Sequence, residues 1–204
     1  MKLQIRVGPS LFTVAVGMAL SAVSRGAEPP ATFALRVIAN PVDHKPVIKR
    51  ASAALANKVV EGDQIVAEWL PFWPGGPAEK ELRGNKEVVL REKPHTFEVL
   101  VICGKDDISQ DDTTYKEHYE DVQGYHNVVI QLTEKGMDAV GRLTTANLPD
   151  PRTGFHRRVA MIVNGRVYSA PQVVAAVFAQ IAISTRSSEE GEHLKDLLRG
   201  SAKK

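Results

Sequence analysis

The stretch that decides the fold is RRVAMIVNGRVYSAPQV, residues 157–173. Its first half alternates apolar residues at Val159, Met161 and Val163, which predicts a strand with one apolar face. Asn164-Gly165 follows, and this pair favours a two-residue hairpin turn because both positions require positive φ. The stretch therefore predicts an antiparallel β-hairpin.

The returning strand, residues 166–173, is expected at the edge of a sheet. Pro171 has no N–H to donate to a neighbouring strand, so it indicates an edge strand or a strand end. An open edge can accept an extended peptide by strand addition. We therefore expect Val167, Tyr168 and Val173 to contribute to a partner-binding surface.

Upstream of the hairpin, the sequence predicts a strand followed by a helix. Residues 127–132 read NVVIQL, a strong strand pattern. Thr133 is a good helix cap, and Glu134 follows in the first turn, where the helix dipole favours negative charge. Downstream, a linker leads to a short strand at 181–184 and a final helix that ends at Gly200. Ser187 and Glu190 fit a capping box for that helix.

The N-terminal half adds further strands and one helix. A helix is expected from Asp43 to about Asn57, and the Pro/Gly-rich residues 71–84 are expected to form a loop. Strands are expected at 33–39, 64–70, 86–91, 96–102 and 113–119. These elements predict an α+β fold, a mainly antiparallel sheet with two to three helices packed on one face.

Residues 1–27 have the pattern of a secretory signal peptide. Lys2 and Arg6 precede an apolar run at 11–23 that is shorter than the ~20 residues a membrane helix needs. We expect cleavage near Ala27 and an exported, periplasmic protein; an uncleaved leader would leave it anchored to the membrane. The mature chain would then have no membrane span.

Charge and residue spacing exclude several function classes. Without the leader, 23 basic residues face 24 acidic ones, which gives no electrostatic footprint for nucleic acid. The six histidines and the single Cys103 have no metal-ligand spacing, and the acidic stretch 106–112 lacks the glycine and terminal glutamate of a calcium loop. No nucleophile motif or phosphate loop is present, so we expect no enzyme activity and no cofactor.

An aromatic cluster lies where a strand meets the Pro/Gly-rich loop. The segment WLPFWPGG contains Trp69, Phe72 and Trp73 within five residues. Aromatic side chains in such a loop can form a contact site for a peptide or a partner surface. The alternative is that Trp69 ends a strand inside the core and the other two cap the sheet. Both interpretations are consistent with the sequence.

The hairpin and its flanks resemble the head subdomain of the first periplasmic domain of SecD/SecDF, a family of protein-export subunits. Residues 158–171 are similar to the family's basic residue, alanine-apolar strand, Asp/Asn-Gly turn and Ser-Ala-Pro. Residues 129–144 are similar to its strand and Thr/Ser-x-x-Gly helix start, with Gly136 at the glycine. Residues 181–200 are similar to its short strand and leucine-rich helix.

The resemblance implies a base-like lobe at 31–94 and a SecD-type head at 95–204, without the membrane bundle that the family carries after Gly200. It also implies a non-enzymatic binding module in protein transport, with polypeptide or translocon components as partners. The alternative is an envelope adaptor that reuses the fold without an export role. Oligomeric state is left open.

Overall fold

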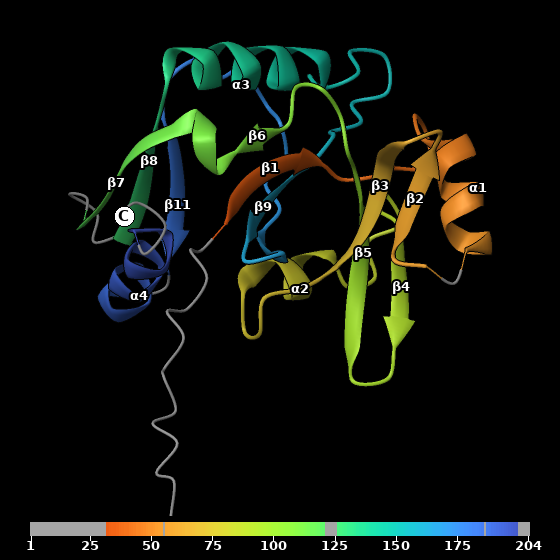
Figure 1. Cartoon of the computed structure of the whole chain (residues 1–204), viewed down its shortest axis with the longest axis horizontal. Helices are drawn as coiled ribbons and strands as arrows, with labels where there is room; N and C mark the ends of the chain where they lie inside the picture. Colours follow the sequence, from red (N-terminus) through yellow and green to blue (C-terminus); the bar gives the residue numbers. More distant parts are fainter. Residues whose placement is uncertain (1–31, 55, 121–125, 186, 200–204) are drawn as a thin grey trace, which may run out of the picture.

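The computed structural model describes residues 32–54, 56–120, 126–185 and 187–199, and these form three antiparallel sheets (Figure 1). The predicted signal peptide lies outside the described residues. The middle sheet has the order β10-β9-β1-β6, the N-terminal sheet β2-β3-β5-β4 and the C-terminal sheet β11-β8-β7. The strands are β1 (Phe33–Val37), β2 (Lys58–Glu61), β3 (Gln64–Pro71), β4 (Leu90–Lys93), β5 (Thr96–Ile102), β6 (Ile108–Ser109), β7 (Thr113–Glu120), β8 (His126–Leu132), β9 (Val159–Val163), β10 (Arg166–Ser169) and β11 (Ile181–Thr185). The helices are α1 (Lys45–Ala53), α2 (Pro77–Leu82), α3 (Glu134–Ala146) and α4 (Ser188–Arg199), with a 3-10 turn at Gln110–Asp112.

The predicted hairpin is confirmed at the centre of the molecule. Asn164 and Gly165 have φ values of 51° and 69°, as the two-residue turn requires. β9 pairs with β10 on one side and with β1 on the other. All five residues of β9 are buried, so this strand has two apolar faces where the alternation predicted one. Ala160 and Ile162 form the second face.

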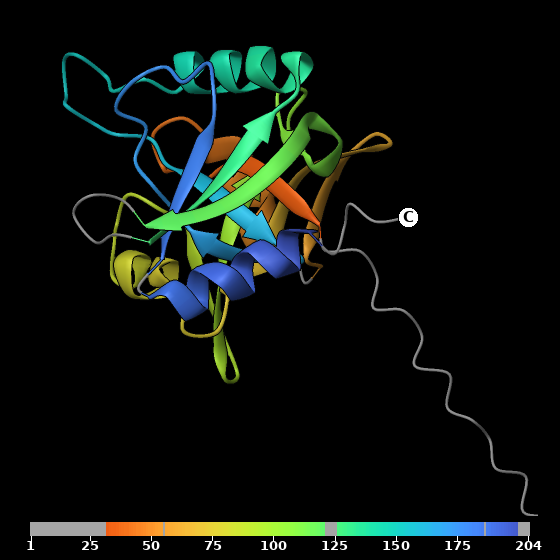
Figure 2. The ribbon, with the colours of Figure 1, turned by 90° about the vertical axis from the view of Figure 1, so that its left-hand side faces the viewer.

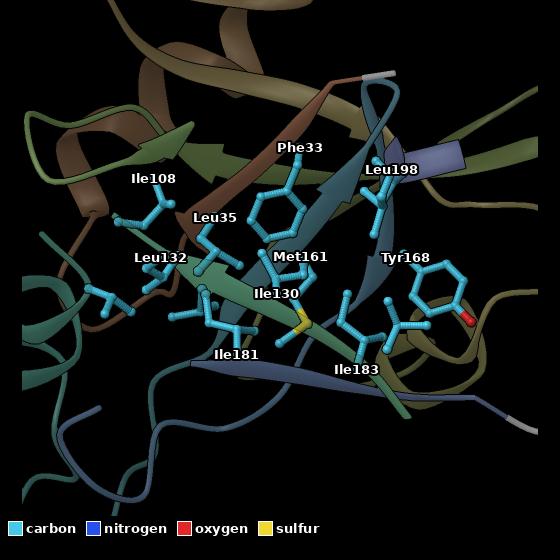
Figure 3. Close-up of a cluster of buried hydrophobic side chains, with 14 of the residues drawn as sticks. Phe33, Leu35, Ile108, Ile130, Leu132, Met161, Tyr168, Ile181, Ile183 and Leu198 are labelled. Carbon is cyan, nitrogen blue, oxygen red and sulfur yellow. The ribbon is translucent and has the colours of Figure 1, made fainter. Parts of the chain in front are cut away.

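The largest core lies between the middle and the C-terminal sheets. Phe33 and Leu35 from β1 and Met161 from β9 face Ile130 from β8 and Ile183 from β11 (Figure 3). The helix α3 lies along one end of the C-terminal sheet, and α4 lies along the opposite end (Figure 2). The mainly antiparallel α+β class is confirmed, whereas the packing of the helices on one face is not confirmed.

A second core connects the middle sheet to the N-terminal sheet, and a third core lies between α1 and the N-terminal sheet. Ala160, Ile162 and Val167 pack against Leu70 and Val101, together with one face of α2. The third core places Ala51 of α1 against Trp69 and Leu100. The middle sheet is therefore covered on both sides at β9, which explains why this strand carries no polar residue.

The N-terminal half differs from the sequence prediction in three places. The expected loop at 71–84 contains α2, which Pro77 starts at its first position and which buries Ala78 and Leu82. The first helix ends at Ala53 rather than near residue 57, and β2 begins at Lys58. The strand expected at 86–91 begins only at Leu90. For α2 the deciding factor is burial of Ala78 and Leu82 in the second core, which local pattern does not report.

The proposed division at residues 94 and 95 stays a prediction. Strands from the two sides of this division pair with each other in the same sheets. β1 from the N-terminal part pairs with β9 in the middle sheet, and β5 from the C-terminal part pairs with β3 in the N-terminal sheet. Arg157 adds a contact across the division, because its Nε lies 2.7 Å from Oδ2 of Asp43.

Candidate functional site

Part of the outer edge of β10 is already covered by another segment of the chain. Phe72 forms a parallel bridge with Val167, and the N–H of Trp73 donates to the Val167 carbonyl over 2.9 Å. The side chains of Val167, Tyr168 and Val173 are all buried. Strand addition at this edge would first have to displace residues 72–73.

The aromatic cluster lies mainly in the core. Trp69 and Phe72 are each 3% exposed, and the guanidinium of Arg91 lies 4.5 Å from the Trp69 ring centroid. Trp73 is half-buried and meets the Tyr168 ring edge to face, with centroids 6.3 Å apart. These positions agree with the core alternative. A direct role of the three aromatics in partner binding stays a prediction.

The structure forms an apolar groove that the sequence did not predict. It lies between α3, the end of β9 and the segment that leads from β10 to β11, and its volume is about 240 Å³. None of its lining residues is charged. The lining comprises Leu35, Val140, Leu143, Thr144, Val159, Met161, Pro171, Gln172, Val173, Val174, Ala175, Val177, Gln180, Ile181 and Ala182. Of the six expected partner-binding residues, Val173 alone lines this groove.

Residues 174–180, which we call the strap, form one wall of the groove. Three large apolar side chains of the strap are exposed: Val174 is 69%, Val177 37% and Phe178 63% exposed. Exposed large apolar groups gathered in one segment mark an interaction site more often than scattered ones do. The sequence signal was the run VVAAVFA, which is unusually apolar for a linker and has neither strand nor helix periodicity.

Three contacts hold the strap against the rest of the fold. The N–H of Val177 donates to the Thr144 hydroxyl over 2.9 Å, and the amide of Gln131 donates to the Gln180 side chain over 2.9 Å. The Phe178 ring lies against α3 at Gly141, where a Cβ would come within 2.4 Å of it. Figure 2 shows the strap rising beside α3 before the chain turns into β11.

The helix α3, the far wall of the groove, is fixed by its own first turn. The hydroxyl of Thr133 accepts from the N–H of Gly136 over 3.0 Å, which confirms the predicted cap. Both the N–H and the hydroxyl of Thr133 donate to the carbonyl of Asp112, over 2.9 and 3.3 Å. The Thr-x-x-Gly motif therefore joins the helix to the turn before β7.

Away from the groove, a charged cluster joins the middle sheet to the N-terminal sheet. Arg36 of β1 contacts Glu68 of β3 over 3.0 Å and Asp107 over 3.1 Å. Burial raises the pKa of Asp107 to about 6, although the N–H of Gly104 and the charge of Arg36 act in the opposite direction. Burial also raises the pKa of the nearby Cys103 thiol, so this cysteine is not an activated nucleophile.

We expect Asp107→Asn to stabilise the protein at pH 7.5 by about 1 kcal/mol, a value reduced from the full shift because the carboxyl is partly solvated. The folded pKa exceeds the unfolded one, so the contribution of Asp107 to the unfolding free energy is present below about pH 4. It is lost as pH rises through about 6. Urea unfolding of both proteins from pH 4 to 7.5 tests this: the advantage of the variant should shrink toward pH 4. A difference that is constant with pH would contradict the assignment.

Other kinds of site are not found in the part of the chain that the structure describes. There, no group of three or more histidine, cysteine, aspartate or glutamate side chains is placed to hold a metal ion. In the same residues no helix is both long and apolar enough to cross a bilayer.

The chain was compared with curated proteins, solved structures and family models. No curated protein matches it. A solved structure of SecDF, a membrane component that enhances protein export, is 18% identical with a TM-score of 0.43, over 83% of this chain and 93% of that one. SecDF in a super-membrane-facing form is 19% identical with a TM-score of 0.42, over 83% of this chain and 28% of that one. SecDF of Thermus thermophilus, a translocon-associated membrane protein, is 17% identical with a TM-score of 0.36, over 85% of this chain and 29% of that one.

The family comparison confirms the resemblance that the hairpin suggested. Residues 87–202 match the model of the SecDF P1 head subdomain. This match includes the strap, α3 and every residue that lines the groove except Leu35, and it spans more than half of the 204 residues. The chain therefore belongs to the SecDF P1 head subdomain family.

Proposed function

We propose that this chain is a non-enzymatic binding module of protein export that holds extended, apolar segments of polypeptide in the groove between α3 and the strap. The observation that carries the proposal is an uncharged groove whose lining includes two exposed large apolar side chains, Val174 and Val177. Family membership supports the link to export. The predicted leader supports an extracytoplasmic location, where translocon components are the partners we propose beside the exported chain.

The lining of the groove selects the chemistry of its occupant. A charged side chain placed among Leu143, Val159 and Met161 would lose its hydration without gaining an ionic partner. An apolar side chain gains by leaving water. The amides of Gln172 and Gln180 are the polar groups of the lining that can bond to a peptide backbone, because the hydroxyl of Thr144 already bonds to Val140 and Val177.

The size of the groove indicates weak and reversible binding. Complete burial of one aliphatic side chain contributes about 1.5–3 kcal/mol. A volume of about 240 Å³ leaves room for few such side chains. Association also costs translational and rotational freedom. We therefore expect transient contacts, which suit a protein that must release a passing chain.

The expected role of Trp69, Phe72 and Trp73 is a separate part of the proposal. Trp73 is the most accessible of the three and packs on Tyr168 beside the first core. A partner that reached the β10 edge would meet Trp73 first. The other two aromatics would support that edge from within the core.

We expect Val174→Asp to weaken the binding of an uncharged, apolar, unfolded peptide about tenfold, because the new carboxylate would have to be desolvated at the rim of the groove. Val174 is 69% exposed, so the substitution should leave the fold intact. Fluorescence anisotropy of a labelled peptide gives the affinity.

Val60→Asp is the matched control. Val60 is 54% exposed on β2 in the N-terminal sheet and does not line the groove. The Val60→Asp variant introduces the same charge and removes a similar amount of exposed apolar surface. Its affinity for the peptide should equal that of the parent protein. Equal losses in the two variants, or peptide binding in neither variant nor the parent, would contradict the proposed function.

A further inference from the structure

We propose that the strap is an autoinhibitory latch. In this latch Phe178, seated on Gly141 of α3, holds residues 174–180 in the position that narrows the groove, and a partner gains full access only when this contact opens. The inference rests on the proposed function, because it concerns access to the same groove. It assigns a role to Gly141, which does not line the groove, and a second role to Thr144, which does.

The seat of the ring exists because residue 141 has no side chain. A Cβ at this position would lie 2.4 Å from Cε1 and 2.5 Å from Cδ1 of Phe178, far inside van der Waals contact. The ring therefore occupies the space that the Cβ of any residue other than glycine would fill at position 141. Glycine inside a helix weakens it relative to alanine, so this position sacrifices helix stability while admitting the ring.

The contact is one-sided. Phe178 remains 63% exposed although its edge rests on the helix, so most of the ring is solvated in the closed form. Opening the strap would expose little additional apolar surface there. Weak contacts of this kind open locally without unfolding the rest of a protein. The latch can consequently respond to a weakly bound partner.

Thr144 provides the second point of attachment. Its hydroxyl donates to the Val140 carbonyl over 2.7 Å and accepts from the N–H of Val177 over 2.9 Å. The Thr144 side chain is itself buried and lines the groove. One turn of α3 therefore holds the strap by a ring contact at Gly141 and by a hydrogen bond at Thr144.

The strap forms a wall that limits the width of the groove. Val174, Ala175 and Val177 line the same groove as Leu143 and Met161. When Phe178 leaves its seat on α3, the strap moves outward with Val174 and Val177 still at the rim, so the groove widens without losing this wall.

The test uses Gly141→Ala in the full chain, because this variant displaces the ring while keeping every strap residue. We expect the exchange of the Val177 amide hydrogen to become on the order of tenfold faster, while the exchange of the α3 amides slows because alanine favours the helix. A structural defect would instead accelerate exchange throughout. Unchanged exchange at Val177 would overturn the latch.

Peptide affinity, measured by anisotropy on the same variant, tests the inhibitory role. Gly141→Ala should bind the apolar peptide about three- to tenfold more tightly than the parent, because the closed state no longer competes. Faster exchange with no gain in affinity would overturn the autoinhibition. Peptide binding by neither parent nor variant, with faster exchange at Val177, would instead remove the proposed function and the inhibition that rests on it.

Thr144 supplies a check that is independent of peptide. Thr144→Val keeps the shape of the side chain but removes the acceptor for the Val177 N–H, and it should accelerate exchange at Val177. Thr144→Ser retains the hydroxyl and should keep exchange close to that of the parent. Equal exchange in the two variants would show that this hydrogen bond does not hold the strap.

Discussion

Replacing Phe33 by alanine should lower the free energy of unfolding by about 3–5 kcal/mol, the largest effect we expect from a single substitution. Phe33 is 1% exposed and lies between the middle and the C-terminal sheets, among Leu35, Met161 and Ile130 (Figure 3). Three strands from separate parts of the chain surround it, so the walls cannot collapse onto the cavity without moving a sheet. Since domains of this size are stable by only about 5–15 kcal/mol, the loss is a large fraction of the total.

Urea unfolding followed by circular dichroism measures this loss, and Phe178→Ala is its matched control. Phe178 is 63% exposed, so the same substitution removes little buried surface and should cost no more than about 1 kcal/mol. Similar losses for the two variants would show that the gap between the sheets repacks freely. It would also mean that this core does not hold the sheets together.

Gly136→Ala should destabilise the protein by about 2 kcal/mol. A Cβ on residue 136 would lie 2.3 Å from the carbonyl oxygen of Asp112 and 3.1 Å from its Cβ. That carbonyl cannot easily retreat, because it accepts from the N–H and the hydroxyl of Thr133. Either the start of α3 or the turn before β7 must shift, and the cap at Thr133 would weaken with it.

The contrast with Gly141→Ala separates two uses of glycine in one helix. At residue 141 the neighbour is the Phe178 ring, a side chain that can move into solvent, and alanine there should be neutral or stabilising by up to about 1 kcal/mol. At residue 136 the neighbour is backbone. Comparing the urea midpoints of the two variants tests this distinction. Equal shifts in the same direction would contradict it.

Sequence determined the elements whose cause is local. Asn164-Gly165 fixed the central hairpin through its positive φ values, and Thr133 fixed the start of α3 through a hydrogen bond within its own first turn. The Thr-x-x-Gly motif could be recognised from the sequence. Its glycine is needed because the backbone of Asp112, 24 residues upstream, lies where a Cβ of residue 136 would be. Family membership could also be inferred from these residues, because they are close together in the chain.

Tertiary structure decided whatever depends on contacts between distant segments. The five apolar residues of β9 reveal two buried faces only when sheets are stacked on both sides of it. Trp69 and Phe72 could equally have been exposed in a loop, and burial against layers from other parts of the chain placed them in the core. The groove required α3, β9 and the strap to meet. Periodicity and turn chemistry act over a few residues, whereas a cavity and its walls are set by packing across the whole chain.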